Sequence, residues 1–442
     1  MDKTAFEPRI GLAWKPFGSE KTAVRAGYAI FHDSSWNQGG QGLWENPPFF
    51  AESAFSSFFP DLCPSPFAPS GQPSACATNG MAIPSGTGRT MSNGFPLLSQ
   101  PTDPATFAGN ISSQNLDFKL GRVQQYNLNV ERQIPGNVVL TLGYAGSRSS
   151  HILVDQMNLN VTSPTACGTV PGYTLGCGIT SIPYPQFQSI FNINDIGRAR
   201  YDSLQVKAET KSAVHGLYAL LGYTYARAFD SGFPDGLGTS SGTTYFPLPG
   251  TKNADWALSQ IQLNNNFTGS VIYELPFGKG KQFGNDWNGA VNAFLGNWEV
   301  DVIEKITSGF PLFIVTSNNA SGVKFGSSTN RPDQVCNGRL SNHTVTEFFN
   351  TSCFVAPAAG ELGNANRTPL YGPGFVNTDF SAIKHFKVHE STDLEFRAEF
   401  FNLFNHPQFF QPGQNLAFSD FGIIQRTVNN PRLIQFALKL TF

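Results

Sequence analysis

The strict alternation of apolar and polar residues at the end of the chain limits its possible folds more than any other feature. Between Leu433 and Phe442, every second residue is large and apolar: Ile434, Phe436, Leu438, Leu440 and Phe442. A period of two places such side chains on one face of a β-strand and the intervening ones on the other. This segment therefore predicts a strand with one apolar and one polar face.

A second stretch, from Leu394 to Phe400, alternates in the same way. Its polar face carries the charged residues Glu395, Arg397 and Glu399. Ionised side chains need water or a partner of opposite charge, whereas the other face of this strand is apolar. A strand of a membrane β-barrel satisfies both needs, because lipid covers one face and the lumen the other. We expect these three residues to face the lumen, where they line a passage or contact a structure that plugs it, or else form ion pairs between strands of the wall.

Further stretches upstream show regular or weaker alternation. They lie at 10–14, 24–30, 125–131, 138–144, 204–209, 217–225, 267–275, 298–306 and 375–386. With the two stretches above they make about eleven strands of roughly the ten-residue length that crosses a bilayer at a tilt. The predicted fold is all-β, an antiparallel transmembrane β-barrel portion in the bacterial outer membrane.

The connections between these stretches alternate between short and long. The short ones lie at 17–21, 135–137, 213–216, 277–294 and 389–393, and the long ones at 34–121, 149–200, 230–264, 317–374 and 407–431. Outer-membrane barrels have short periplasmic turns and long extracellular loops. Aromatic residues near the expected strand ends, namely Trp14, Phe17, Tyr144, Tyr225 and Phe229, are typical of the headgroup layer.

Composition agrees with a barrel. The chain has 44 Gly, 30 Pro and 40 Phe, and only 14% of its residues are charged, against about 25% in ordinary soluble domains. It contains no apolar run of the ~20 residues that a transmembrane helix needs. The mean hydropathy of −0.19 is compatible with membrane strands, because half of their residues are polar. A formal net charge of −2 provides no basic face for nucleic acid.

The six cysteines form three local pairs, and each pair lies within one long connection. The pairs are Cys63 with Cys76, Cys167 with Cys177, and Cys336 with Cys353. Neither a Cys-x-x-Cys spacing nor a His cluster accompanies them, which argues against zinc. We expect disulfides formed in an oxidising compartment, and the alternative is free thiols in loops.

Patterns that carry catalytic chemistry do not occur. The run from Gly278 to Lys281 lacks the frame of a phosphate-binding P-loop, and the seven His residues are scattered without the spacing of a zinc site. A Gly-x-Ser-x-Gly nucleophile elbow is also missing. The sequence predicts neither an enzyme nor a bound cofactor or metal.

Several motifs resemble those of TonB-dependent outer-membrane receptors, especially the Oar-like type with an N-terminal carboxypeptidase-regulatory-like domain. The most specific is Phe396 to Phe409, FRAEFFNLFNHPQF, followed by Asn429-Asn430-Pro431-Arg432. Supporting matches are PRIGLAW at 8–14, VRAGY at 24–28 and YELPFGKG at 273–280. The resemblance covers nearly all expected strands but not the long connections.

The resemblance implies about half of a 22-stranded barrel, so that residues 1–442 form the C-terminal part of a receptor β-barrel. The plug domain, the TonB-box and a signal peptide are absent from this chain, as expected of a gene fragment or truncated product. The implied function is uptake of a bulky nutrient, of the siderophore, cobalamin or glycan class. The implied partners are outer-membrane lipid, an unknown extracellular ligand and the TonB complex, which acts through the missing plug.

Two other functions remain open. One is a passive pore or an adhesin-like structural barrel without energy coupling, and the other is a soluble β-rich carbohydrate-binding or secreted enzyme domain. The one-sided apolar alternation disfavours the second of these.

Phe436, Leu438, Leu440 and Phe442 resemble the C-terminal signal that the barrel assembly machinery recognises by pairing with an exposed strand edge. We expect deletion of Phe442 to lower the amount of the full protein inserted in the outer membrane, because the terminal anchor of that edge is lost. Quantitative surface labelling measures this. An unchanged surface level would contradict the assignment.

Overall fold

The computed structural model describes residues 5–18, 20–33, 111–160, 183–184, 187, 190–210, 215–231, 256–316, 331–357, 363–389 and 392–442. Eleven strands succeed one another across an antiparallel sheet in the order in which they occur along the chain. These strands are β1 (Arg9–Trp14), β2 (Thr22–Asp33), β4 (Gly121–Ile134), β5 (Val138–Asn158), β6 (Ile190–Thr210), β7 (Leu217–Asp230), β9 (Asn265–Glu274), β10 (Trp298–Thr307), β15 (Phe375–His389), β16 (Thr392–Phe401) and β17 (Leu433–Thr441). The predicted all-β fold and its number of strands are confirmed.

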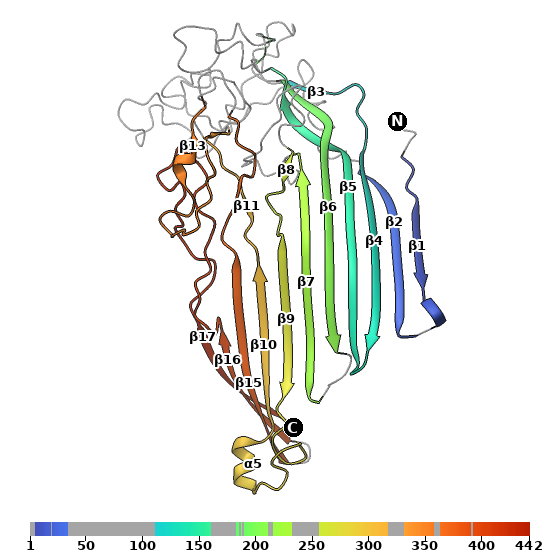
Figure 1. Ribbon diagram of the computed structural model, residues 1–442, viewed down its shortest axis with the longest axis vertical. Helices are drawn as coiled ribbons and strands as arrows, with labels where there is room; N and C mark the ends of the chain where they lie inside the picture. The colour runs from blue at the N-terminus through green and yellow to red at the C-terminus, as the bar shows by residue number, and fades with distance from the viewer. Residues whose placement is uncertain are drawn as a thin grey trace, which may run out of the picture.

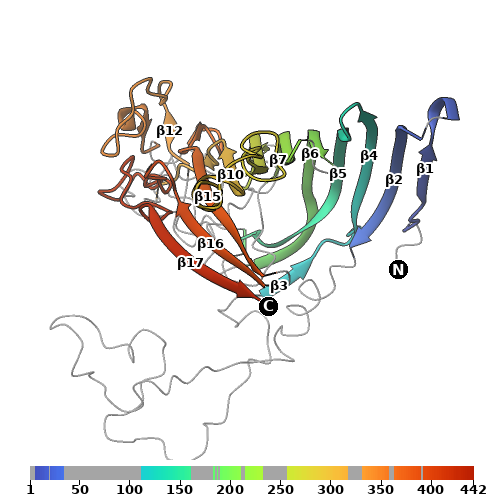
Figure 2. The ribbon, with the colours of Figure 1, turned by 90° about the horizontal axis from the view of Figure 1, so that it is seen from below.

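The strands lie side by side, with the described parts of the long connections at one end and the turns at the other (Figure 1). Two short strands join the sheet outside this order: β3 (Ile111–Gln114) pairs with β6, and β8 (Ala257–Leu258) pairs with β7. Seen from below, the sheet is a curved trough that does not close (Figure 2). Within the described residues, β1 and β17 form its two edges and do not pair with each other.

The tight turns at the short-connection end use residues that accept a positive φ. Gly136 and Asn137 have φ of 84° and 55° between β4 and β5, and His215 and Gly216 have φ of 51° and 85° before β7. A type I′ hairpin turn needs positive φ at both central positions, which Gly and Asn adopt most easily. These turns hold the alternating residues in register on both sides.

The connection predicted at 149–200 is wrong at both ends. β5 continues to Asn158 and β6 begins at Ile190, and the two strands stay paired through three register shifts. One shift contains His151, whose φ is 55°. The next residue, Ile152, is paired with Gly197, where an added Cβ would lie 2.7 Å from the carbonyl oxygen of Ile152. Apolar alternation ends here because this part of the hairpin extends beyond the apolar band, but backbone pairing does not need alternation.

The predicted short connection at 277–294 is also more than a turn. It contains α5 (Gly289–Leu295), whose N-cap Asn288 accepts a hydrogen bond from the backbone of Val291 at 2.8 Å. Within the described part of the chain, no helix is long and apolar enough to cross a membrane.

At the other end, two connections pack together into a unit that we call the loop cap, made of residues 308–316, 331–357, 363–374 and 402–432. Its core consists of Leu312, Ile314, Phe349, Cys353, Phe354 and Leu370. The short strands β11 (Pro311–Leu312) and β14 (Leu370–Tyr371) pair within it, as do β12 (Asp333–Gln334) and β13 (Phe354–Val355). The loop cap thus contains the hydrophobic core cluster found among the residues that the structure describes.

Rings from both connections meet in this core. Phe349 lies edge-on to Phe354 and to Phe421, with ring centroids 5.8 and 5.1 Å apart. Full burial of a Phe side chain is worth roughly 1.5–3 kcal/mol. A disulfide joins Cys336 to Cys353, which is fully buried beside these rings. The segments of the cap therefore support one another.

An ion pair ties the loop cap to the end of β7. The guanidinium of Arg367, 2% exposed, pairs with the carboxylate of Asp230 and donates to the Asp230 carbonyl oxygen at 3.0 Å. Thr368 donates to the carbonyl oxygen of Leu258 in β8 at 3.0 Å. Removal of one partner of a buried ion pair costs about 3–5 kcal/mol. The rim on this side of the sheet is therefore firmly connected.

The segment after β16 forms a hydrogen-bonded clamp over the ends of β15, β16 and β17. Asn402 has φ of 53°, and its backbone N–H donates to Asp379 of β15 at 2.9 Å. Its side-chain oxygen accepts from the backbone of His406 at 2.9 Å. Its side-chain nitrogen donates to the carbonyl oxygens of His406 and Asn430, both at 3.2 Å.

Gln408 and Asn405 complete the clamp. The backbone N–H of Val376 in β15 donates to Gln408 at 2.8 Å, and the Gln408 amide returns a hydrogen bond to the Val376 carbonyl. Asn429 accepts from the backbone of Gln408 at 2.8 Å, and Asn405 accepts from the backbone of Arg432 at 2.9 Å. The motif residues that carry the family resemblance thus join the ends of three neighbouring strands.

Asn402 tests the importance of this clamp. We expect Asn402→Ala to lower the free energy of unfolding by about 1–3 kcal/mol, because it removes the side-chain hydrogen bonds and leaves a residue that adopts positive φ less readily than Asn. Asn402→Gly also removes those hydrogen bonds but adopts this φ without steric cost, so its loss should be smaller. The midpoint temperature of heat-modifiable gel mobility measures both changes. Equal midpoints for Ala, Gly and the native residue would contradict the role of the clamp.

Candidate functional site

Cross-strand pairing places apolar residues from successive strands on a common face, which we call the apolar face. One continuous row of directly paired residues shows it: Trp14, Val24, Val130, Leu142, Val206, Tyr223, Phe267, Ile306 and Val376. The neighbouring row, on the polar face, is made of Arg25, Asn129, Gly143, Gln205, Thr224 and Asn266. A sheet with two such faces is suited to separate lipid from water.

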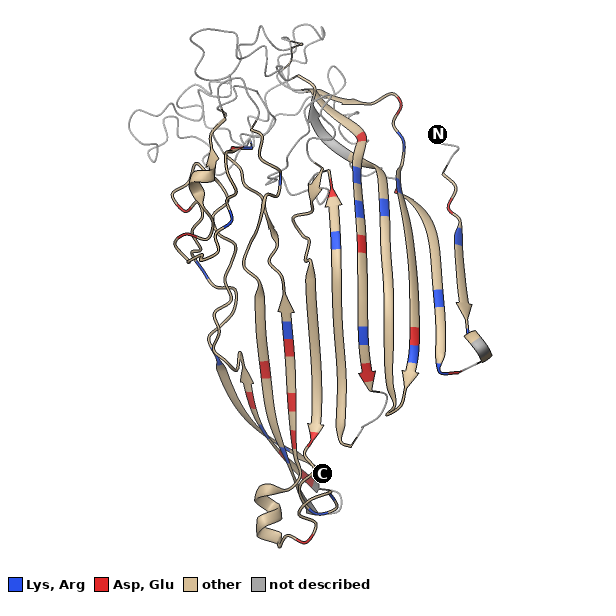
Figure 3. Ribbon diagram, viewed as in Figure 1, with Lys and Arg blue, Asp and Glu red and all other residues tan. Residues whose placement is uncertain are grey.

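Charged residues occur on many strands, β10, β15 and β16 among them (Figure 3). The register places Asp301, Ser381 and Glu399 in one row on the polar face. The guanidinium of Arg397 donates to Glu395 at 2.5 Å and to Glu399 at 3.5 Å. The ion pairs of these residues therefore run along β16, rather than between strands as in one of the two arrangements expected from the sequence. With the Arg397 side chain 41% exposed, they contribute at most about 1 kcal/mol each.

Carboxylates exceed cations in this part of the wall. Glu299 and Asp301 of β10 lie on the same face, because Asp301 is paired in register with Ser381 and Ser381 with Glu399. One oxygen of Asp301 is buried without a hydrogen-bond partner among the described residues. A surface with surplus acceptors can bind groups that donate hydrogen bonds or carry positive charge.

Ion pairs also occur on the polar face of the other strands. Arg25 of β2 contacts Glu131 of β4 at 3.0 Å, and Lys207 contacts Glu209 within β6 at 2.8 Å. The polar face is charged along its whole width, but the excess of acids lies at β10 to β16.

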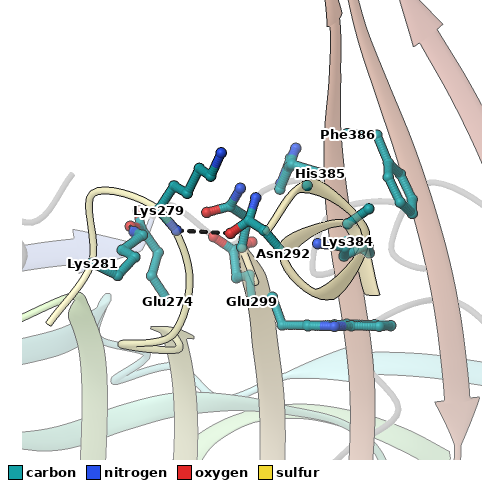
Figure 4. A pocket seen from close by; sticks show the side chains of 12 residues that line it. Glu274, Lys279, Lys281, Asn292, Glu299, Lys384, His385 and Phe386 are labelled. Atoms are coloured by element: carbon teal, nitrogen blue, oxygen red, sulfur yellow. Dashed lines mark hydrogen bonds and ion pairs between the residues drawn. The ribbon is translucent and has the colours of Figure 1, made fainter. Parts of the chain in front are cut away.

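A cavity of about 800 Å³ lies at the short-connection end of this acidic region, beside α5 (Figure 4). Its lining includes both acidic and basic side chains: Glu274, Lys279, Lys281, Glu299, Lys384 and His385. Lys281 pairs with Glu274 at 2.6 Å, while Lys384 contacts the Gly296 carbonyl and lies over the ring of Phe386 at 5.0 Å. The cavity is polar and opens at the rim of the sheet.

Glycine geometry explains the YELPFGKG motif beside this cavity. Gly278 has φ of 120°, and an added Cβ would lie 2.8 Å from the Cα of Gly296. The next backbone N–H, of Lys279, donates to the Asn292 side chain at 2.8 Å. The motif therefore folds the turn against α5, which sequence reasoning treated only as a basic turn.

The structure locates the other residues singled out in the sequence. Phe436 and Leu438 lie on the apolar face of the edge strand β17, as does Leu440, and Phe442 is 93% exposed. Cys63, Cys76, Cys167 and Cys177 lie outside the described residues. Among the residues that are described, no cluster of His, Cys, Asp and Glu is arranged to hold a metal ion.

Sequence reasoning missed the Asp230–Arg367 pair and the clamp. Asp230 and Arg367 are 137 residues apart, and no local pattern marks them as partners. The Asn-rich motifs at 402–405 and 429–430 were recognised only by resemblance, although Asn at a strand end is a general signal for positive φ.

Comparison with known proteins gives a family for almost the whole chain. A family model described as an outer membrane beta barrel domain matches residues 1–435. No curated protein matches the sequence.

Similar solved structures include the outer membrane transporter YddB from Escherichia coli, with 8% identity, a TM-score of 0.45, and coverage of 98% of this chain and 40% of that one. The pyoverdine outer membrane receptor FpvA from Pseudomonas aeruginosa PAO1 has 10% identity, a TM-score of 0.40, and coverage of 99% and 36%. BauA, the ferric preacinetobactin receptor from Acinetobacter baumannii, has 10% identity, a TM-score of 0.40, and coverage of 98% and 36%. The chain spans 40% or less of the length of these structures.

Adjacent residues of β16 test the assignment of the two faces. We expect Glu399→Cys to react with a membrane-impermeant charged maleimide in intact outer membranes, because its side chain faces water. Phe400→Cys, one position along the strand, should stay unreactive under lipid and become reactive after denaturation. Mass spectrometry of the labelled peptide measures both. Equal labelling of the two variants before denaturation would contradict the assignment.

Proposed function

Because this chain belongs to the outer membrane beta barrel domain family, we propose that it forms part of the wall of a TonB-dependent receptor that imports a bulky nutrient through the bacterial outer membrane. The localisation follows from the family. The observation that carries the proposal is the clamp made by Asn402 and Gln408, because these residues belong to the motif Phe396 to Phe409, which has the most specific resemblance to such receptors, and give it a defined place at the rim of the wall.

The polar face supports the proposal that these strands form a wall around an internal structure or a passage. Its charges would be costly against lipid, where an Arg or Lys at mid-bilayer on a barrel strand costs about 2–4 kcal/mol and an Asp or Glu somewhat less. The acceptor-rich surface of Glu299, Asp301 and Glu399 needs water or a donor-bearing partner inside the barrel. Both are available in a plugged, energy-coupled receptor.

The open sheet supports the proposed place of residues 1–442 in the C-terminal part of a larger barrel. The outer edges of β1 and β17 carry backbone groups that have no strand partner within the described residues. Such groups cost several kcal/mol each in hydrocarbon. In this proposal other strands close the barrel, a plug fills it, and the TonB complex acts on that plug.

The proposed ligand class is a nutrient too large for diffusion through a narrow pore, such as a siderophore, cobalamin or a glycan. The loop cap supports this class, because it holds long connections in a fixed arrangement at the end of the wall where we place the extracellular ligand. The free edge of β17 and its terminal aromatic residue support recognition by the barrel assembly machinery during insertion.

Uptake by intact cells tests the proposal. Cells with and without the complete gene would be supplied with a radiolabelled ferric catecholate siderophore, cobalamin or a maltooligosaccharide. We expect accumulation of one probe that requires the gene and is abolished by a protonophore, because the TonB complex draws its energy from the inner membrane. A gene-dependent influx that rises linearly with concentration and resists the protonophore would instead identify a passive pore. Cell adhesion without any uptake would identify a structural barrel.

A further inference from the structure

We propose that the apolar face of β5–β7 carries, near its long-connection end, a binding site for a phosphate-bearing lipid of the outer leaflet. The site consists of Arg148, Arg200 and Arg227, organised by Asp202. It does not depend on energy-coupled uptake, because a pore or an adhesin in the same membrane would present the same face to lipid.

The register places these residues in two adjacent rows above an aromatic row. Leu128, Tyr144, Leu204 and Tyr225 are directly paired across β4 to β7. The next row contains Tyr126, Gly146, Asp202 and Arg227, and the row beyond it contains Gln124, Arg148, Arg200 and Phe229. The side chains therefore change from aliphatic to aromatic to charged along one face.

This order matches the depth profile of a bilayer. Aromatic rings with a polar tip favour the boundary between hydrocarbon and headgroups. Arginine on the lipid side of a barrel is costly at mid-bilayer but costs only about 0–1 kcal/mol near the interface. The long connections of such barrels are extracellular, which places the arginine rows at the headgroups of the outer leaflet.

Asp202 holds two of the arginines in place. Its carboxylate accepts from Arg148 at 3.0 Å and from Arg200 at 2.7 Å. The hydroxyl of Tyr144 donates to the same carboxylate at 2.6 Å. The Arg148 guanidinium also lies 5.6 Å from the centroid of the Tyr126 ring. The guanidinium groups of Arg148 and Arg200 are therefore ordered before any ligand binds, which lowers the entropic cost of binding.

The cluster carries more positive charge than Asp202 can neutralise. Arg227 is exposed, lies opposite Asp202 in the register and has no ion pair within the described residues. Arg122, exposed on the same face, is paired in register with Ser150 one row further out. The side chains of Arg148 and Arg200 remain 36% and 53% exposed. An anionic ligand complements this excess.

Guanidinium groups bind phosphate and carboxylate groups well, because a planar fork of N–H donors matches two oxygens of either anion. The neighbouring tyrosines and leucines offer an apolar surface to acyl chains directly below. A lipid with a phosphorylated headgroup satisfies both parts of the surface, whereas a free anion satisfies only one.

Gly146 shapes the surface between the arginines and the aromatic row. The ring of Tyr126 lies over it, and an added Cβ would come within 2.4 Å of that ring. The glycine therefore lets Tyr126 lie flat against the sheet beside Arg148.

Binding of diphosphoryl lipid A to the full chain in detergent, followed by native mass spectrometry, tests the proposal. We expect Arg227→Gln to weaken binding by about tenfold or more, because a charge-assisted hydrogen bond to phosphate is lost without breaking an ion pair of the wall. Arg132→Gln is the matched control. Arg132 is exposed on the same face at the short-connection end, where it contacts Thr22 at 3.3 Å.

Unchanged heat-modifiable mobility establishes that both variants remain folded. Equal loss of binding in Arg227→Gln and Arg132→Gln, or no loss in Arg227→Gln, would overturn the site. Equal binding of lipid A from which the phosphates have been removed would overturn the role of phosphate. Displacement by inorganic phosphate at concentrations comparable to the lipid would overturn the assignment to a lipid.

Discussion

The cost of an unpaired backbone group in hydrocarbon governs this structure. An N–H or C=O without a partner costs several kcal/mol in lipid, so each strand must give its backbone to its neighbours. The antiparallel order from β1 to β17 is the result. The side chains then determine only which face of the sheet is turned toward lipid. Where the strands leave the apolar band this requirement ends, and the chain forms the α5 turn at one end and the clamp and loop cap at the other.

The same constraint decides what the sequence could predict. A strand with lipid on one face and water on the other must alternate apolar and polar residues. The bounds of strands such as β16 and β17 were therefore predicted to within a residue or two. The continuation of β5 to Asn158 was missed because a strand outside the apolar band does not need alternating residues. The face of Glu395 and Glu399 follows from their spacing, but their pairing along the strand with Arg397 depends on side-chain conformation. The arginine cluster comes from three strands and exists only through register, which no local pattern encodes.

The most specific motif of the chain describes architecture rather than a ligand. Asn402, Asn405 and Gln408 use their side chains to join strand ends, and Gly278 allows a turn to pack closely. None of these roles depends on the identity of a transported solute. Such residues can therefore identify a family of barrels without identifying a substrate.

The loop cap also has a mechanical consequence. Its core draws on connections on both sides of β15 and β16, and the Asp230–Arg367 pair extends the attachment to β7. The rim from β7 to β17 should therefore move as one stiff block. In the proposed receptor, any rearrangement that admits a solute is then confined to the remaining arc of the rim and to whatever fills the interior, so stiffness from β7 to β17 sets the side on which the opening can widen.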